Sequence, residues 1–128
     1  MNKYGQAALK AVELIELQCE TTPEEAWEAA TIEIFGIGTS SQIKGCPKNT
    51  FLALCETGKV KGVIAGTYTQ SVKNKGYAVK ALELLHAEPS FSEKPNDLWK
   101  KIQGEVQKKH NSQMNVVLAL CNNGLIVV

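Results

Sequence analysis

Cys46 is the residue whose type and surroundings best suit nucleophilic chemistry. It stands at the predicted start of a helix, and Lys44 and Lys48 lie on either side of it in the sequence. A helix N-terminus and nearby ammonium groups both favour the thiolate, which is the nucleophilic form of the Cys side chain. His110 and Asn111 would complete the set that cysteine hydrolases use, with His as the base and Asn orienting the imidazole ring.

A second interpretation gives the same residues no chemistry: Cys46 is a turn residue, and His110-Asn111 caps a helix. The hydrolase hypothesis requires the Cys46 sulfur to lie within hydrogen-bond reach of the His110 ring, whereas the second interpretation makes no such demand. Enzymatic activity therefore stays open at this point, and the sequence favours a protein without catalysis.

No cofactor and no metal site is predicted. The four Cys residues include no CxxC pair, which is the spacing typical of structural zinc sites. Gly36-Ile-Gly38 lacks the third Gly of a dinucleotide-binding loop and follows a predicted helix instead of a strand.

Positive charge is concentrated in the middle of the chain. Residues 1–36 contain two Lys and seven Glu, whereas residues 37–80 contain seven Lys and one Glu. All 14 positive residues are Lys, which neutralises phosphate but lacks the planar fork with which Arg reads guanine. The basic segment could bind nucleic acid or another anionic partner. Alternatively, it pairs with the acidic first third, either within one chain or between the subunits of a homo-oligomer.

Residues 39–69 resemble the core of a winged helix-turn-helix. The resemblance rests on a short helix before Gly45, a recognition helix from Pro47, and a hairpin wing after Gly58. It implies that lysines contact phosphates and that two polar residues of the recognition helix reach base edges. The nucleic-acid-binding residues would be Lys44, Lys48, Asn49, Thr50, Lys59, Lys61, Tyr68, Lys73 and Lys75.

The elements that must position these residues are mainly helical. With 128 residues, 44% of them hydrophobic, the chain suits one compact domain over residues 1–128. Apolar periodicity predicts about six helices, near residues 4–19, 23–35, 48–56, 74–85, 95–106 and 113–121. Thr22-Pro23 is a typical helix start. A small β-hairpin or short strands are expected near residues 60–69, with a further short strand at 125–128.

Two nearly identical strings, FLALCETG at 51–58 and VLALCNNG at 117–124, occur in the sequence. The residues upstream of the two strings do not align with each other, which argues against a duplicated module. We interpret both as helix C-termini that Gly58 and Gly124 close in a left-handed conformation.

Other strings resemble a small uncharacterised bacterial protein family of unknown function. They are GTSS at 38–41, KGCPK at 44–48, VKG at 60–62 and HNSQM followed by VVLAL at 110–120. The resemblance covers most of residues 36–124 and implies a whole protein, without indicating an activity.

No membrane or secretory segment is predicted. The longest fully apolar run is Val116–Cys121, far below the ~18 residues of a membrane span. The N-terminus lacks the basic start and apolar middle of a signal peptide. We therefore expect a cytoplasmic binding or regulatory module. Nucleic acid is the first candidate partner, a homo-oligomeric interaction protein is the alternative, and a cysteine-dependent enzyme is the third hypothesis.

Overall fold

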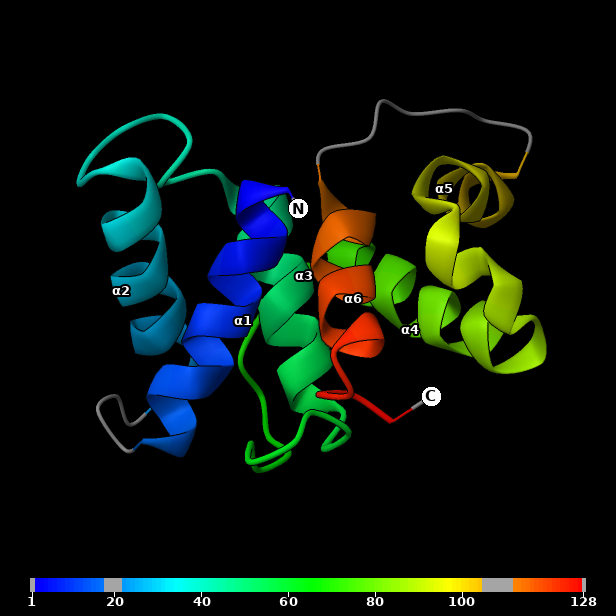
Figure 1. The fold of residues 1–128 in the computed structure, drawn as a ribbon, viewed down its shortest axis with the longest axis horizontal. Helices are drawn as coiled ribbons and strands as arrows, with labels where there is room; N and C mark the ends of the chain where they lie inside the picture. Colours follow the sequence, from blue (N-terminus) through cyan, green and yellow to red (C-terminus); the bar gives the residue numbers. More distant parts are fainter. Residues whose placement is uncertain (1, 18–21, 105–111, 128) are drawn as a thin grey trace.

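The computed structural model describes residues 2–17, 22–104 and 112–127, and these residues are mainly helical, as predicted (Figure 1). Its helices are α1 (Lys3–Glu16), α2 (Pro23–Phe35), α3 (Gly45–Glu56), α4 (Val72–Ala87), the short 3-10 helix η1 (Pro89–Glu93), α5 (Pro95–Gln103) and α6 (Gln113–Asn122). None of the described helices combines the length and apolar character that crossing a membrane requires.

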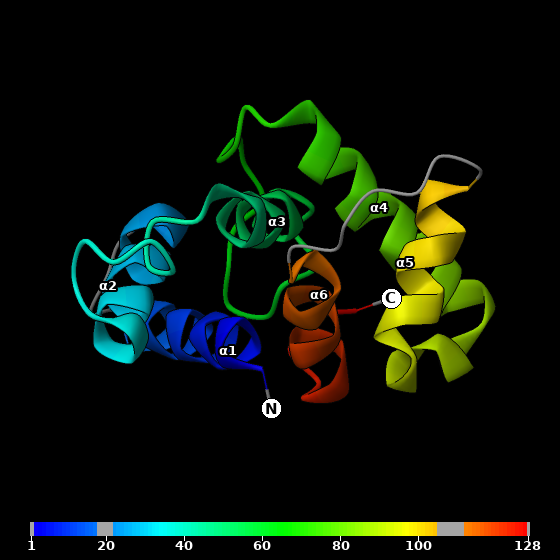
Figure 2. The ribbon, with the colours of Figure 1, turned by 90° about the horizontal axis from the view of Figure 1, so that it is seen from above.

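Helices α3 and α6 occupy the middle of the molecule, with α1 and α2 on one side and α4 and α5 on the other (Figures 1 and 2). α6 packs against α1, α3, α4 and α5. Most of its apolar residues are buried, and Met114, Val116 and Leu120 are fully so. The prediction that this apolar helix is central to the core is therefore confirmed, because a helix with neighbours on every side needs apolar residues around its whole circumference.

Local capping residues set several helix ends. The Thr22 side chain accepts a hydrogen bond from the Glu25 backbone N–H at 3.1 Å, and Pro23 is the first residue of α2, as predicted. α3 begins at Gly45, two residues before Pro47, and not at Pro47 or Lys48. Pro47 is tolerated there because the first N–H groups of a helix have no partner within the helix.

Gly58 and Gly124 follow α3 and α6 with φ angles of 75° and 70°. Both therefore adopt the left-handed conformation that the two related strings predict. α5 ends at Gln103, before the predicted end near residue 106, and Gly104 follows it with a φ angle of 65°; residues 105 and 106 lie outside the described residues.

The hairpin predicted within residues 60–69 does not form, although this whole segment is described. Val60 instead makes one antiparallel bridge with Ile126, flanked by backbone hydrogen bonds from Lys61 to Leu125 at 2.8 Å and from Val127 to Lys59 at 3.1 Å. Val60 was predicted to pair with residues 67–69, but it pairs with Ile126 from the strand expected at 125–128. Val60 has its partner elsewhere, and residues 63–70 run as irregular chain.

The winged helix-turn-helix resemblance is corrected by the same finding. Its wing requires the missing hairpin, and its first short helix is a turn at residues 40–43. The recognition helix alone is present, as α3. A helix that follows a turn is common to many folds, so α3 without a wing does not indicate a winged helix-turn-helix.

Candidate functional site

Cys46 lies in the first turn of α3 and is half-buried. Its backbone carbonyl accepts a hydrogen bond from the Thr50 hydroxyl at 2.8 Å. His110 and Asn111, the other members of the predicted hydrolase set, lie outside the described residues. The set therefore stays a prediction.

The two residues predicted to read bases both serve the fold. Thr50 is fully buried, so its hydroxyl has no access to a base edge in this conformation. The Asn49 side-chain oxygen accepts a hydrogen bond from the Thr69 hydroxyl at 2.8 Å. This bond links the irregular segment that follows α3 back to α3 itself.

Three of the predicted phosphate-binding lysines have partners within the chain. Lys48 Nζ lies 2.9 Å from Glu24 Oε1 and joins α3 to α2. Lys75 Nζ lies 3.2 Å from Glu56 Oε1 and joins α4 to the end of α3. Lys44 Nζ lies 5.7 Å from the centre of the Tyr4 ring, within the range of a cation–π contact. Part of the basic segment therefore compensates acidic and aromatic groups of the same molecule.

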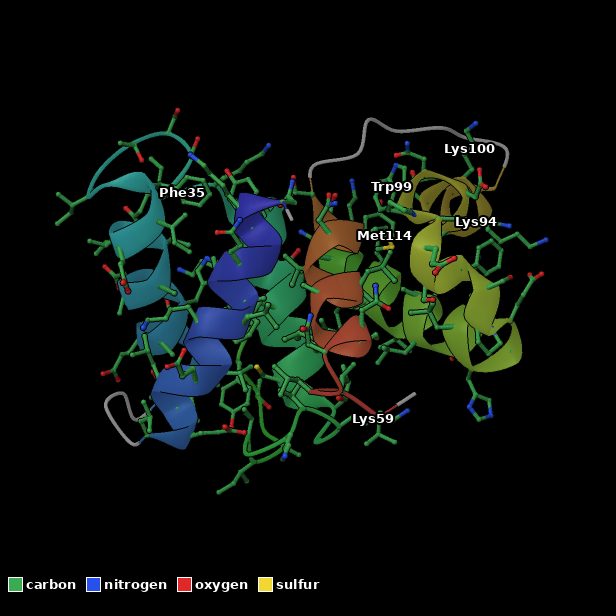
Figure 3. All side chains as sticks on the ribbon, viewed as in Figure 1. Phe35, Lys59, Lys94, Trp99, Lys100 and Met114 are labelled. Carbon is green, nitrogen blue, oxygen red and sulfur yellow. The ribbon has the colours of Figure 1, made fainter. Side chains whose placement is uncertain are left out.

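Lys59, Lys61 and Lys73 are exposed, and none of them forms an ion pair with an acidic side chain among the described residues. Lys59 lies at the edge of the molecule where the C-terminal segment passes (Figure 3). Tyr68 is half-buried, and its hydroxyl donates to the Ile64 carbonyl at 2.6 Å. Within the predicted nucleic-acid-binding set, the lysines without an acidic partner among the described residues therefore lie in the segment after α3 and in the first turn of α4.

A hollow of about 390 Å³ lies between the end of α3 and the outer face of α4, and we call it the α4 hollow. Its lining residues are Thr57, Lys59, Val79, Leu82, Glu83 and His86. Leu82 is buried, whereas 39% of the Val79 surface is exposed. The hollow therefore has an apolar interior with charged or titratable groups around it.

An apolar stripe along α4 runs into this hollow. Val72, Gly76 and Val79 follow one another at spacings of four and three residues, so they share one face of the helix. A Cβ atom added at Gly76 would have no neighbour within 4 Å, so the helix backbone is accessible there. Lys59, which lines the hollow, accepts a backbone hydrogen bond from the Val127 N–H, and Val127 is 71% exposed.

The sequence interpretation missed the α4 hollow, although one signal for it is present. A solvated helix face normally carries polar residues, whereas the outer face of α4 carries the exposed apolar residues Val72 and Val79. The sequence alone does not show that the end of α3 packs beside this face, and this packing forms the hollow.

A family model described as a family of unknown function, DUF6979, matches residues 1–127. The chain belongs to this family. The resemblance to an uncharacterised family is thereby confirmed, and the match extends beyond the residues 36–124 that carry the distinctive strings. No curated protein and no solved structure matches the chain. The function of this DUF6979 member is therefore argued from its geometry.

Two further thiols of the DUF6979 chain are poor nucleophiles near neutral pH. Burial raises the pKa of Cys121 from 9.0 to about 11, and burial raises the pKa of Cys55 still further. Both thiols are therefore neutral in the folded protein at neutral pH. Cys121 also lines a second hollow of about 390 Å³ on the other side of His86, together with Leu85 and Pro89.

Proposed function

We propose that this protein is a non-catalytic interaction module that associates with a second copy of itself through the α4 hollow. The observation that carries the proposal is the apolar hollow on α4 with Lys59 and Glu83 both on its lining. Protein interfaces commonly have this composition, with apolar residues at the centre and charged residues at the rim.

The apolar part of the surface supports contact with protein. Val79 is partly exposed beside buried Leu82 on the lining of the hollow. Gly76 permits a second helix to approach the α4 backbone closely, because no side chain stands between them. A partner side chain that enters the hollow would remove the exposed part of Val79 from water, and burial of apolar surface is the main driving force of association.

The charges around the hollow support a second copy as the partner. A two-fold axis places each residue of one surface opposite a different residue of the same surface on the other subunit. Lys59 of one subunit can therefore meet Glu83 of the partner subunit, and the reverse pair forms at the same time. Opposite charges on one lining are thus self-complementary.

The acidic and basic thirds of the sequence give less support to association. Lys48 pairs with Glu24 and Lys10 with Glu33, at 2.9 and 3.9 Å, within one molecule. These groups have little charge left to offer a second subunit. The α4 hollow therefore supports association better than the overall charge asymmetry does.

The proposal is tested by measuring the molar mass of the protein over a range of concentrations. We expect the wild type to form dimers and the Val79→Glu variant to remain a monomer, because the variant places a charge at the centre of the contact. Ile37→Glu is the matched control, since Ile37 is 79% exposed on the loop after α2, away from α4. A monomeric wild type at high concentration, or a Val79→Glu variant that still dimerises, would contradict the proposal.

Charge reversal tests the two-fold arrangement separately. Lys59→Glu and Glu83→Lys should each weaken the dimer, because each places like charges opposite one another. The double variant should restore much of the affinity. If the double variant associates more weakly than either single variant, the two residues do not face each other across the interface.

Nucleic acid is a second candidate partner, favoured by the exposed Lys59, Lys61 and Lys73. Such binding would weaken steeply with salt, because each phosphate contact releases condensed counterions. A gel shift at low salt that Lys61→Met weakens would support this candidate. Lys61 lies outside the α4 hollow lining and outside α4, so this change should leave the dimer intact and the two functions are tested independently.

A further inference from the structure

The end of α6 carries a chemically reactive pair of residues, Asn123 and Gly124. Asn123 is the only Asn in the sequence that is followed by Gly. In an Asn-Gly pair the backbone nitrogen of Gly can attack the side-chain amide carbon of Asn, because Gly has no Cβ that would crowd the approach. Both residues are exposed, so water can reach them. The pair that closes the second of the two related strings is therefore a candidate site of chemical modification.

The reaction that suits this pair is deamidation. A bond forms between the Gly124 nitrogen and the Asn123 side-chain carbon Cγ, while the bond from Cγ to Nδ2 breaks. The Gly124 nitrogen loses its proton to water or hydroxide, and the departing amino group takes up a proton and leaves as ammonia. The resulting five-membered succinimide ring is then opened by one water molecule to give aspartate or isoaspartate. Water is thus consumed and ammonia released, and no other reactant is needed.

Backbone hydrogen bonds at the end of α6 hold the attacking nitrogen. The Gly124 N–H donates to the Cys121 carbonyl at 3.3 Å, and the Leu125 N–H donates to the Leu120 carbonyl at 2.9 Å. These are the two bonds of a Schellman motif, in which a residue in the left-handed conformation ends the helix. Gly124 is that residue, with a φ angle of 70°. The attacking nitrogen is therefore turned toward α6 in the folded chain.

The conformation of Asn123 also opposes the reaction. Closing the ring requires the Gly124 nitrogen to lie on the same side of the Asn123 Cα–C bond as Cβ. The ψ angle of Asn123 is 13°, which places the Gly124 nitrogen beside the Asn123 backbone nitrogen instead. The Asn123 side-chain amide donates to the Ala119 carbonyl at 2.7 Å, so turning it toward Gly124 breaks a further bond. The chain therefore has to open at this point before the ring can close.

We propose that Asn123 is a deamidation site of this protein, and that it reacts through local opening of the C-terminal end of α6. Helix ends and terminal segments open at a lower free energy than the core of a protein. The segment after α6 is held beside the end of α3 by the bridge between Val60 and Ile126 and by its flanking backbone bonds (Figure 1). Releasing this segment frees Asn123 and Gly124 while the surrounding helices stay in place.

Deamidation would in turn weaken the attachment of this segment. A carboxylate at position 123 has no N–H to donate, so the Ala119 carbonyl loses its partner. The new negative charge lies at the end of α6 where the helix dipole is also negative. Isoaspartate in addition adds a carbon atom to the backbone immediately before Gly124. The Lys61 N–H, which donates to the Leu125 carbonyl at 2.8 Å, should therefore exchange its hydrogen faster in the deamidated protein.

Incubation at mildly alkaline pH, followed by digestion and mass spectrometry of the peptide that contains Asn123, tests the proposal. In urea, where the chain is unfolded, we expect Asn123 to react before any other Asn. Gly124→Ala should slow the reaction in urea about tenfold or more, because the new Cβ crowds the nitrogen. In buffer without urea, Asn123 should react measurably but at least about tenfold more slowly than in the unfolded chain.

Variants distinguish local opening from unfolding of the whole chain. Ile126→Ala removes the buried side chain that holds the C-terminal segment and should raise the rate in the folded protein several-fold. Val127→Ala is the matched control, because Val127 is exposed on the same segment. Thr22→Ala weakens the start of α2 and should leave the rate unchanged, whereas a route through global unfolding would raise it about fivefold. Circular dichroism establishes that each variant is folded before it is compared.

Three outcomes would overturn the proposal. In the first, another Asn reacts before Asn123 in the unfolded chain. In the second, Asn123 reacts as fast in the folded protein as in urea, which means that the bonds at the end of α6 give no protection. In the third, Ile126→Ala reacts no faster than the wild type, or Thr22→Ala reacts faster, which shows that local opening of this segment does not control the reaction.

Discussion

Gly58 and Gly124, the glycines that follow α3 and α6, allow the free-energy cost of a steric contact to be measured separately from the cost of a left-handed backbone. Gly58 and Gly124 have nearly the same φ angle, 75° and 70°. An L-residue in this region costs about 1–2 kcal/mol, so Ala should destabilise the protein by that amount at either position. At Gly124 an added Cβ meets nothing within 4 Å, whereas at Gly58 it lies 3.0 Å from the Ala65 Cβ.

Gly58→Ala should therefore cost more than Gly124→Ala. Forcing an extra methyl group against a packed neighbour adds about 1 kcal/mol or more, which gives about 2–4 kcal/mol for Gly58→Ala. Unfolding in urea, followed by circular dichroism, measures both free energies. For a chain of this length the additional cost at Gly58 corresponds to a further fall in Tm of about 4 °C.

A double-mutant cycle with Ala65→Gly isolates the contact. Gly at position 65 removes the methyl group that the new Cβ would meet, so the cost of Gly58→Ala should fall to that of Gly124→Ala. Ala65→Gly combined with Gly124→Ala should be additive, because those positions share no contact. Equal losses at Gly58 and Gly124 in the wild-type background would refute the steric argument, and no loss at either would refute the left-handed conformation.

Three shorter predictions concern other parts of the fold. Thr22→Ala should cost about 1 kcal/mol in urea unfolding because the Glu25 N–H loses its cap, and Thr22→Ser should retain most of the stability. Ile126→Ala should cost about 2–4 kcal/mol because Ile126 is 6% exposed, whereas Val127→Ala should stay within about 0.5 kcal/mol. Burial raises the pKa of Cys121 from 9.0 to about 11, so its neutral thiol stabilises the fold below pH 9.0 and this contribution is lost as pH rises toward 11. Between about pH 8 and about pH 10.5, the free energy of unfolding should therefore fall more in the wild type than in Cys121→Ala.

Features that depend on a few neighbouring residues were predictable from the sequence. The Thr22-Pro23 start of α2 follows from the chemistry of the first helical turn, and Gly58 and Gly124 follow from the conformation that ends a helix. The central position of α6 was predictable for a similar reason. A helix that is apolar on all sides has no stable place at the surface.

Features that depend on distant residues were not predictable in this way. Val60 can pair with the nearby residues 67–69 or with Ile126, and the local pattern favours the short turn. The structure selects Ile126, which is buried and brings the C-terminal segment beside α3. Thr50 illustrates the same limit, since its type suits a base contact but its side of α3 faces the core.

The α4 hollow and the unpartnered Trp27 indole N–H were both missed, and for different physical reasons. The hollow arises where the end of α3 crosses α4, so it depends on a helix packing arrangement that no single segment encodes. The Trp27 indole N–H has no acceptor among the described residues, whereas the sequence pattern of α2 shows only that Trp27 belongs to the core. Composition indicates burial, but it does not indicate which polar atoms of a buried residue lack partners.

In the folded chain, ion pairs within the molecule use part of the charge that is unevenly distributed along the sequence. Lys48 pairs with Glu24 and so joins the basic segment to the acidic first third, whereas Lys75 pairs with Glu56 inside the basic segment. The solvated Lys48–Glu24 pair contributes little stability, typically below about 1 kcal/mol. Lys59 forms no ion pair among the described residues and lines the α4 hollow together with Glu83, so these two charges can meet their opposites on a second copy in the proposed dimer.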